Sequence, residues 1–382
     1  MPRGGPVPVP VPLRTPRAGA VVAVALTGLL LAGCAAGAQP DGGGASDAPV
    51  VRLADSTPLA DPASYVGPST AVLGAPDGDP LPAAEPQLPV TLTDVQGTEV
   101  TVTDVSRVLA LDLYGTLSQI TYDLGLGERL VGRDTSSSFP GSDELPLVTQ
   151  GGHTLNGEAV LELAPTVLIT DTTLGPWDVV LQVRDAGIPV VVVDSHRTVD
   201  GVGTLIGQVA AALGVPGAGE QLAEATAAEI TAKVAEIAAV APQEPERRLR
   251  MLFLYLRGQA GVYYMFGRDS GADSLITALS GRDVAGEIGW SGMKPLTDEG
   301  LVAAQPDLVL VMTEGLRSVG GVEGLLEQVP ALAQTPAGQR HRIVDMADSQ
   351  VLGFGPRTAD VLDALATAVY APGATVPTEV PR

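Results

Sequence analysis

The stretch LNGEAVLELAPTVLIT at residues 155–170 has a counterpart in LTDEGLVAAQPDLVLVM at residues 296–312. In both stretches, a polar residue precedes a short helical pattern, and a proline lies seven residues after a glutamate and just before an apolar run. A polar N-cap explains how each helix begins, and recurrence of the whole pattern indicates a repeated structural unit. The sequence therefore predicts two copies of one α/β unit, with Glu158 and Glu299 at equivalent places.

Short apolar runs separated by helical patterns extend this plan over the rest of the chain. Such runs are typical of parallel strands that are buried on both faces, as in βα units. They occur at 108–111, 130–132, 167–170 and 190–193 in the first half, and at 252–256, 308–312 and 343–345 in the second half. Alternating segments at 90–93 and 99–102 predict a hairpin before them. The predicted fold class is α/β, with two Rossmann-like lobes.

A long helical pattern lies between the two halves. Gly214 and Pro216 are typical of the end of one helix and the start of the next, which we expect to run from about 218 to 240. At 1.5 Å per residue this helix is roughly 35 Å long, and Glu229 and Lys233 form a favourable pair one turn apart. We therefore expect a long rigid helix that joins the lobes and permits only modest movement between them.

The N-terminal segment has the features of an exported lipoprotein. Three arginines precede an apolar run at 18–31, which ends in the letters LAGC at residues 31–34. A charged region, a short apolar core and a small-residue cleavage site define a signal peptide. The run is shorter than an ordinary membrane-spanning helix of about 20 residues. LAGC matches the bacterial lipobox, which implies that cleavage leaves Cys34 as the lipid-bearing first residue; the alternative is a buried cysteine in a core helix.

Composition limits the partners of such a protein. The chain carries a formal charge of −22, and removal of residues 1–33 lowers it to −25. An acidic body argues against nucleic acid or an anionic membrane surface as a partner. Cys34 is the only cysteine, so no internal disulfide supports the fold. We expect a monomer that contacts the membrane only through its lipid anchor.

These patterns divide the chain into six expected segments. Residues 34–87 are rich in Gly, Pro, Ala and Asp and lack a sustained apolar period, so we expect a disordered tether there. The segments are a lipoprotein signal peptide at 1–33, the tether at 34–87, an N-terminal α/β lobe at 88–200, a helical linker at 201–243, a C-terminal α/β lobe at 244–372 and a tail at 373–382.

Two side chains in different halves are candidate ligands of one metal centre. His153 follows two glycines in a predicted loop, which gives it room to project, and histidine is the commonest metal ligand. Tyr255 ends an apolar run, and a phenolate is an oxygen donor that suits ferric iron. An unperturbed tyrosine keeps its proton at neutral pH, so a phenolate ligand needs a positive neighbour. Arg257 lies two residues on, which places it on the same face of a strand.

Five short segments of the sequence carry a specific resemblance to a known family of proteins. Together with the lipobox and the paired glutamates, they resemble the substrate-binding proteins of bacterial ABC importers for cobalamin, siderophores and haem, which have the class III periplasmic-binding-protein fold. Within that family, the likeness is to the haem-binding lipoproteins of actinobacterial haemin importers, the HmuT type, and it covers about residues 88–371. The segments are GGHTLNGE (151–158), YLRG (255–258), GMKPLT (292–297), TEGL (313–316) and GFGPR (353–357).

The resemblance implies a site and its partners. In that family, haem iron is held by a histidine of the first lobe and a tyrosine of the second, with an arginine two residues after the tyrosine, and these positions match His153, Tyr255 and Arg257. The two glutamates that dock arginines of the permease match Glu158 and Glu299. The resemblance thus implies a carrier of ferric haem and not an enzyme. It would be lipid-anchored on the outer face of the cytoplasmic membrane and would deliver haem to an ABC permease and its ATPase.

Other residues near these segments have two interpretations. Tyr263 and Tyr264 are rival iron ligands, but they lie in what reads as the next strand, where we favour packing. Trp290 and Met293 could cover a porphyrin face or form a wall of the lobe. Arg357 could contact a haem propionate or only shape the start of the last helix. From residue types alone, a loop histidine is more often a surface residue, and a tyrosine at a strand end is more often part of the core.

Other functions agree less well with the residues. A siderophore or cobalamin receptor would share the fold, but siderophore sites gather several cationic or aromatic groups, and cobalamin sites need no phenolate. A zinc or manganese carrier would need three or four convergent ligands, and the chain has only three histidines. A haem-dependent enzyme would need an open axial position on the iron. Hydrolases and nucleotide enzymes have motifs that the sequence lacks.

Overall fold

The computed structural model describes residues 50–74 and 79–374, which belong to one compact unit. The predicted signal peptide, Cys34 and most of the predicted C-terminal tail lie outside the described residues. Within the described part, no helix combines the length and the apolar character needed to cross a membrane.

The first lobe is built on three parallel strands in the order β4-β7-β8. These are β4 (Val108–Leu111), β7 (Val167–Thr170) and β8 (Val190–Val192); two antiparallel pairs accompany them, β2 (Val90–Thr93) with β3 (Glu99–Val102), and β5 (Thr149–Gln150) with β6 (Thr154–Leu155). The run at 130–132, which we expected to be a strand, makes only an isolated bridge from Leu130 to Val108. The chain leaves the sheet there because Arg133 pairs with Leu147 instead.

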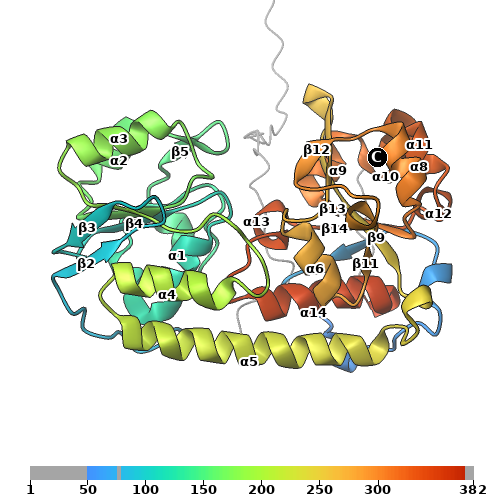
Figure 1. Cartoon of the computed structure of the whole chain (residues 1–382), viewed down its shortest axis with the longest axis horizontal. Coiled ribbons are helices and arrows are strands. Elements are labelled where there is room, and N and C mark those ends of the chain that lie inside the picture. Colours follow the sequence, from blue (N-terminus) through green and yellow to red (C-terminus); the bar gives the residue numbers. More distant parts are fainter. Residues whose placement is uncertain (1–49, 75–78, 375–382) are drawn as a thin grey trace, which may run out of the picture. The chain divides into compact units, whose positions relative to one another are not determined.

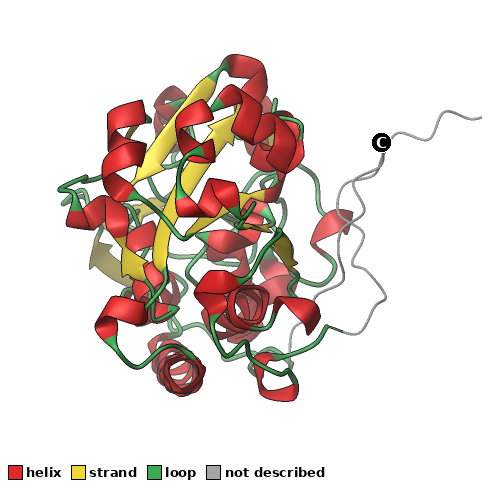
Figure 2. Ribbon diagram, turned by 90° about the vertical axis from the view of Figure 1, so that its right-hand side faces the viewer, coloured by secondary structure: helices red, strands yellow, loops and turns green. Residues whose placement is uncertain are grey.

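The second lobe contains a mixed sheet in the order β1-β14-β13-β9-β10-β12, with β11 beside β9. Strands β1, β14, β13 and β9 are parallel, whereas β10 and β12 are antiparallel to their neighbours. The bounds are β1 (Ser69–Ala71), β9 (Arg250–Arg257), β10 (Val262–Phe266), β11 (Arg282–Asp283), β12 (Met293–Pro295), β13 (Leu308–Met312) and β14 (Ile343–Met346). Helices lie on both sides of these strands in Figure 2.

Helices connect and cover the strands. The α-helices are α1 (Thr116–Thr121), α2 (Gly157–Glu162), α3 (Trp177–Asp185), α4 (Val202–Ala212), α5 (Pro216–Val240), α6 (Ala272–Ala278), α7 (Val284–Glu287), α8 (Asp298–Ala304), α9 (Thr313–Ser318), α10 (Gly321–Gln328), α11 (Pro330–Ala333), α12 (Pro336–Gln339), α13 (Asp348–Val351) and α14 (Thr358–Tyr370). Short 3-10 turns occur at Leu53–Asp55, Pro62–Ser64, Gly127–Arg129, Ser142–Glu144, Pro245–Arg247, Gly258–Ala260 and Pro372–Ala374, and a π-helical turn occurs at Tyr122–Leu126.

The predicted long helix is present as α5, which runs along one side of both lobes (Figure 1). Pro216 begins it, as the sequence indicated, because a proline lacks only an N–H that the first turn leaves unpaired. Lys233 Nζ lies 2.6 Å from a carboxylate oxygen of Glu236 and 2.6 Å from one of Asp363. Asp363 belongs to α14, so this ion pair joins the linking helix to the second lobe.

Part of the segment predicted to be a tether is folded. Residues 69–71 form β1 at the edge of the second-lobe sheet, where they pair in parallel with β14. The Ser69 hydroxyl donates to Ala368 O at 2.7 Å and accepts from Arg342 Nη1 at 2.8 Å. The tether prediction was wrong for this stretch because hydrogen bonds to a finished lobe, and not an apolar period of its own, order it.

Side-chain alternation divides each sheet into two faces. One apolar core contains residues of both lobes, including Ile230 and Ile237 of α5, and it covers the inner face of each sheet. A second core lies on the outer face of the second-lobe sheet, and a third lies on the outer face of the first-lobe sheet. The shared core explains why the two lobes form one compact unit.

Candidate functional site

His153 lies at the tip of a tight hairpin in the first lobe. Strands β5 and β6 are joined by Gly151, Gly152 and His153. Both glycines have positive φ, at 57° and 95°, a region that favours glycine because it has no Cβ. No atom lies within 4 Å of the position that a Cβ would occupy on either glycine. Backbone conformation therefore requires the glycines, and the exposed imidazole projects from the tip.

Tyr255 and Arg257 lie at the end of β9 on the inner face of the second-lobe sheet. Tyr255 is half-buried and packs against the shared core, as Phe253 does, whereas Leu254 and Leu256 belong to the outer core. Residues two apart in a strand share a face, so Arg257 follows Tyr255 on the inner side. Arg257 is the last residue of β9, and it is exposed. Tyr255 and Arg257 thus share one face of β9, which is the placement that the spacing predicted.

Aromatic side chains surround Tyr255. Tyr264 lies directly opposite it on β10, with ring centroids 6.4 Å apart, and Phe266 stacks on it at 6.5 Å. Met293 of β12 pairs with Phe266 and, because directly opposed residues point to one face, lies on this inner face. Its side chain is exposed. Met293 therefore lies on the same side of the sheet as Tyr255. Tyr264, for which we favoured a packing role, packs beside the candidate ligand.

The two lobes bring His153 and Arg257 into electrostatic range. Desolvation by surrounding protein atoms lowers the pKa of His153, and the positive charge of Arg257 lowers it further. The imidazole is exposed by area, so the desolvation arises from nearby atoms that displace part of its solvent. The candidate ligands were predicted on separate halves of the chain, and the effect of Arg257 on His153 indicates that these two residues of different lobes lie within electrostatic range of each other.

Three other residues that the sequence offered as candidates make their contacts away from Tyr255. Trp290 packs in the outer core, and its Nε1 donates to Met265 O at 3.0 Å, so it lies on the opposite face of the sheet from Tyr255. Tyr263 also points outward, and its hydroxyl donates to Gln328. Arg357 donates to Asp360 Oδ2 at 3.2 Å and to Gly74 O at 2.7 Å. These contacts give Trp290, Tyr263 and Arg357 structural roles that do not involve Tyr255.

Glu158 and Glu299 occupy equivalent and exposed positions. Glu158 is in the first turn of α2, which Asn156 caps through its side chain, and Glu299 is in the first turn of α8, which Thr297 caps. Each carboxylate is suitably placed to complement its helix dipole. Neither of them makes an ion pair with any other residue of the described ranges.

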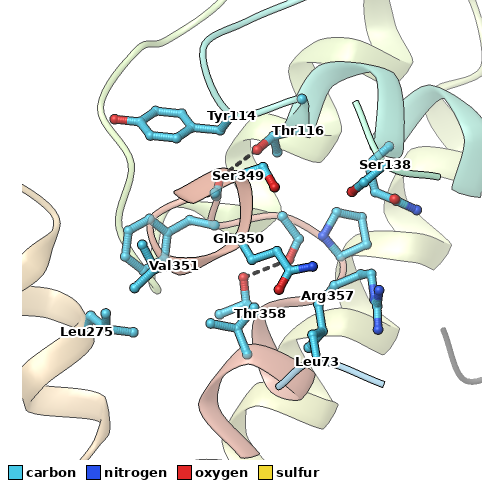
Figure 3. A pocket seen from close by; sticks show the side chains of 17 residues that line it. Leu73, Tyr114, Thr116, Ser138, Leu275, Ser349, Gln350, Val351, Arg357 and Thr358 are labelled. Carbon is cyan, nitrogen blue, oxygen red and sulfur yellow. Dashed lines mark hydrogen bonds between the residues drawn. The ribbon is translucent and has the colours of Figure 1, made fainter. Parts of the chain in front are cut away.

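A pocket lies where the two lobes meet. Its first-lobe lining includes Tyr114, Thr116 and Ser138, and its second-lobe lining includes Leu275 and Arg357. Thr116 Oγ1 donates to Gly353 O at 2.7 Å across the junction (Figure 3). Neither His153 nor Tyr255 lines this pocket. The candidate ligands therefore lie outside this pocket, on the His153 hairpin and on β9.

Sequence reasoning missed a buried ionic cluster at the carboxyl ends of the first-lobe strands. Arg197 Nη2 lies 2.6 Å from Asp171 Oδ2 and 3.2 Å from Asp112 Oδ2, and all three side chains are buried. Asp134 lies beside them and accepts from Asp112 N at 3.4 Å. Burial raises the pKa of Asp171 to about 6, with the charge of Asp112 as a second cause. Asp112 directly after β4 and Asp171 directly after β7 were the sequence signal for this cluster.

The described residues contain no group of three or more His, Cys, Asp or Glu side chains arranged to hold a metal ion. The candidate ligands are instead one imidazole in the first lobe and one phenol in the second, with a guanidinium two residues after the phenol. Such a set can supply one ligand from each side of a flat metal complex.

Comparisons with known proteins agree with this arrangement. The protein is similar to YvrC of Bacillus subtilis (strain 168), an uncharacterized ABC transporter substrate-binding lipoprotein, at 25% identity over 286 residues, which cover 74% of this chain and 86% of that protein. It is similar to the crystal structure of the heme binding protein HmuT, with 40% identity, a TM-score of 0.74 and coverage of 81% of this chain and 99% of that chain. Periplasmic heme binding protein HutB of Vibrio cholerae is 30% identical, with a TM-score of 0.58 and coverage of 70% and 100%.

Solved variants of HmuT replace a histidine, a tyrosine or an arginine by alanine, and the replaced tyrosine and arginine are two positions apart, as Tyr255 and Arg257 are. Residues 113–349 match the model of a family described as periplasmic binding protein. With this match over more than half of its length and HmuT at 40% identity, the chain belongs to the periplasmic binding protein family, whose members bind substrates and are not enzymes.

Proposed function

We propose that this protein binds ferric haem between its lobes, with His153 and Tyr255 as axial ligands, and presents it to an ABC importer. The proposal is supported by the 40% identity of the chain to a heme binding protein, by the places of His153 in the first lobe and of Tyr255 and Arg257 on β9 of the second, and by the lowering of the pKa of His153 by Arg257. A relative named for ABC transport supports the importer assignment.

The chemistry of the residues fits this ligand. Ferric iron in a porphyrin has two open axial positions, and an imidazole and a phenolate can fill them from opposite sides. Arg257 follows Tyr255 on the inner face of β9, where its guanidinium can donate a hydrogen bond to an iron-bound phenolate. Tyr264, Phe266 and Met293 supply apolar surface on the same face. Ligation from both sides leaves no axial position for peroxide, so the site suits carriage.

Absorbance spectra of the purified protein with haemin test the ligand assignment. We expect Tyr255→Ala to lose the high-affinity ferric complex, His153→Ala to retain haem with a changed spin state, and Arg257→Ala to weaken binding less. His196→Ala is the matched control, because the exposed His196 ring bonds to Asp194 at 2.8 Å. If the Tyr255 and His153 variants give wild-type spectra, the assignment is wrong.

Delivery to the importer involves two exposed glutamates and a lipid anchor in this proposal. Glu158 and Glu299 lie on equivalent helices of the two lobes and dock arginines of the permease, while Cys34 carries the lipid that holds the protein at the outer face of the cytoplasmic membrane. The double substitution Glu158→Arg and Glu299→Arg should leave the haem spectrum unchanged and abolish haemin uptake by cells. Normal uptake by this variant would place docking elsewhere.

A further inference from the structure

The helices that carry the two glutamates share a second feature. Leu161, three residues after Glu158, is 37% exposed, and Val302, three residues after Glu299, is 52% exposed. Side chains three apart on a helix are neighbours on its surface. Each helix therefore presents a carboxylate and an aliphatic group side by side to solvent.

The two helices are also packed in the same way. Val160 of α2 is buried in the outer core of the first lobe, and Leu301 of α8 is buried in the outer core of the second lobe. Because these anchors occupy equivalent places in the repeat, they turn Leu161 and Val302 outward in the same manner. Figure 1 shows α2 and α8 on the side of the lobes opposite α5.

Leu161 and Val302 are informative together because they occupy the same position in the two repeats. Single exposed aliphatic side chains are common on protein surfaces, so neither Leu161 nor Val302 alone would indicate a contact. The described residues expose nine large hydrophobic side chains, and two of them fall at the same position of the repeat, each beside a glutamate. Each of the two side chains keeps a large share of its apolar surface in contact with solvent, although its buried neighbour Val160 or Leu301 already anchors the helix.

We propose that Glu158 with Leu161 and Glu299 with Val302 form two matching docking contacts, which bind the extracytoplasmic face of the importer's permease at two places. This inference rests on the proposed function and extends it. Each contact fits a cation with an apolar depression beside it. The cation pairs with the carboxylate, and the depression takes the aliphatic side chain.

Salt screening explains why both components are needed. Exposed ion pairs contribute little affinity at physiological ionic strength, because water and salt screen them. Burial of an aliphatic side chain is not screened by salt and is non-directional. The glutamates would therefore set the register and orientation of docking, and Leu161 and Val302 would supply affinity that persists in salt.

Haemin uptake tests the proposal in cells of the source organism that lack their own copy of the protein. The docking variant Leu161→Ser/Val302→Ser is compared with the control variant Val95→Ser/Val66→Ser, which removes one exposed valine from the β2–β3 turn and one from the segment before β1. Val95 and Val66 are 53% and 68% exposed. We expect uptake to fall about tenfold in the docking variant and to stay within about twofold in the control.

Haemin absorbance of each purified variant must remain that of wild type, which separates docking from ligand binding. The conservative variant Leu161→Met/Val302→Ile should restore uptake, because it restores apolar volume. Uptake within about twofold of wild type in the docking variant would overturn the proposal. The proposal would also be overturned if the wild-type protein forms a dimer and the docking variant does not, because the surface would then join two copies of the protein. Failure of wild-type protein to bind haemin would refute the proposed function instead.

Discussion

His153 of the first lobe lies within electrostatic range of Arg257 of the second lobe. Desolvation lowers the pKa of the His153 imidazole, and the Arg257 guanidinium lowers it further. A lowered pKa keeps the ring neutral at physiological pH, and only the neutral ring has a nitrogen lone pair for a metal. Arg257, which follows the proposed ligand Tyr255 on β9, thus also favours the ligating form of the imidazole in the other lobe.

Arg257→Gln should raise the pKa of His153 toward the ordinary histidine value. NMR titration of the protein without haem measures this directly, since the chain has only three histidines, His153, His196 and His341. The His153 resonance should shift its midpoint upward, while those of the other two stay in place. Arg317→Gln is the control, because Arg317 is exposed and pairs with Glu314. An unchanged midpoint for His153 in the Arg257 variant would show that the two groups do not interact in solution.

Tyr264→Ala should weaken haem binding by roughly two- to thirteenfold, the range expected when an aromatic neighbour contributes about 0.5–1.5 kcal/mol. Tyr264 lies opposite Tyr255 on the inner face, at 6.4 Å between ring centroids. Tyr263→Ala is the matched control one residue away, and it should leave haem affinity unchanged because Tyr263 faces outward and bonds to Gln328. Equal effects of the two substitutions on a haemin titration would contradict the assignment of faces.

Much of the fold could be predicted because it depends on local patterns. The runs 108–111, 167–170 and 308–312 form strands with the expected bounds, and the long helix begins at the proline that the sequence indicated. The resemblance to haem-binding substrate-binding proteins is likewise confirmed by the comparisons. The strand β1 was missed because its order comes from contacts with Arg342 and Ala368, which lie far along the chain.

The details of the site depend on how strands and loops from distant parts of the chain pair with one another, which no local sequence pattern specifies. Met293 and Trp290 were equal candidates in the sequence, but the register of β12 places Met293 on the inner face, whereas Trp290 joins the outer core. The partners of Arg197 come from loops after two different strands, Asp112 and Asp171, so their convergence requires the parallel order β4-β7-β8. The ligand assignment itself stays a prediction.

Arg197→Met should lower the free energy of unfolding by about 3–5 kcal/mol at neutral pH, because it leaves buried carboxylates without their cation. Asp112 and Asp171 are both fully buried beside it. Arg317→Met, which removes an exposed pair with Glu314, should cost less than about 1 kcal/mol. Urea unfolding measures both. A loss below about 1 kcal/mol for the Arg197 variant would mean that the cluster is not a coupled ionic unit.

The pH dependence of stability should reveal the proton held by Asp134. Burial raises the pKa of Asp134 to about 7, and the negative charge of Asp112 adds to the effect. The folded protein therefore binds this proton more tightly than the unfolded chain, whose aspartates titrate near pH 4. The stabilising contribution is complete below about pH 4 and is lost as pH rises through about 7.

Asp134→Asn should reduce the loss of unfolding free energy between pH 5 and pH 8 by at least about 1 kcal/mol, because the amide stays neutral throughout. The amide oxygen can still accept the backbone bonds from Ser136 and Ser137, both 2.8 Å long, so the local turn should persist. Urea unfolding at the two pH values gives the comparison, with the exposed Asp178→Asn as control. If the Asp134 variant loses as much stability as wild type over this interval, then Asp134 is already ionised in the folded protein at pH 5.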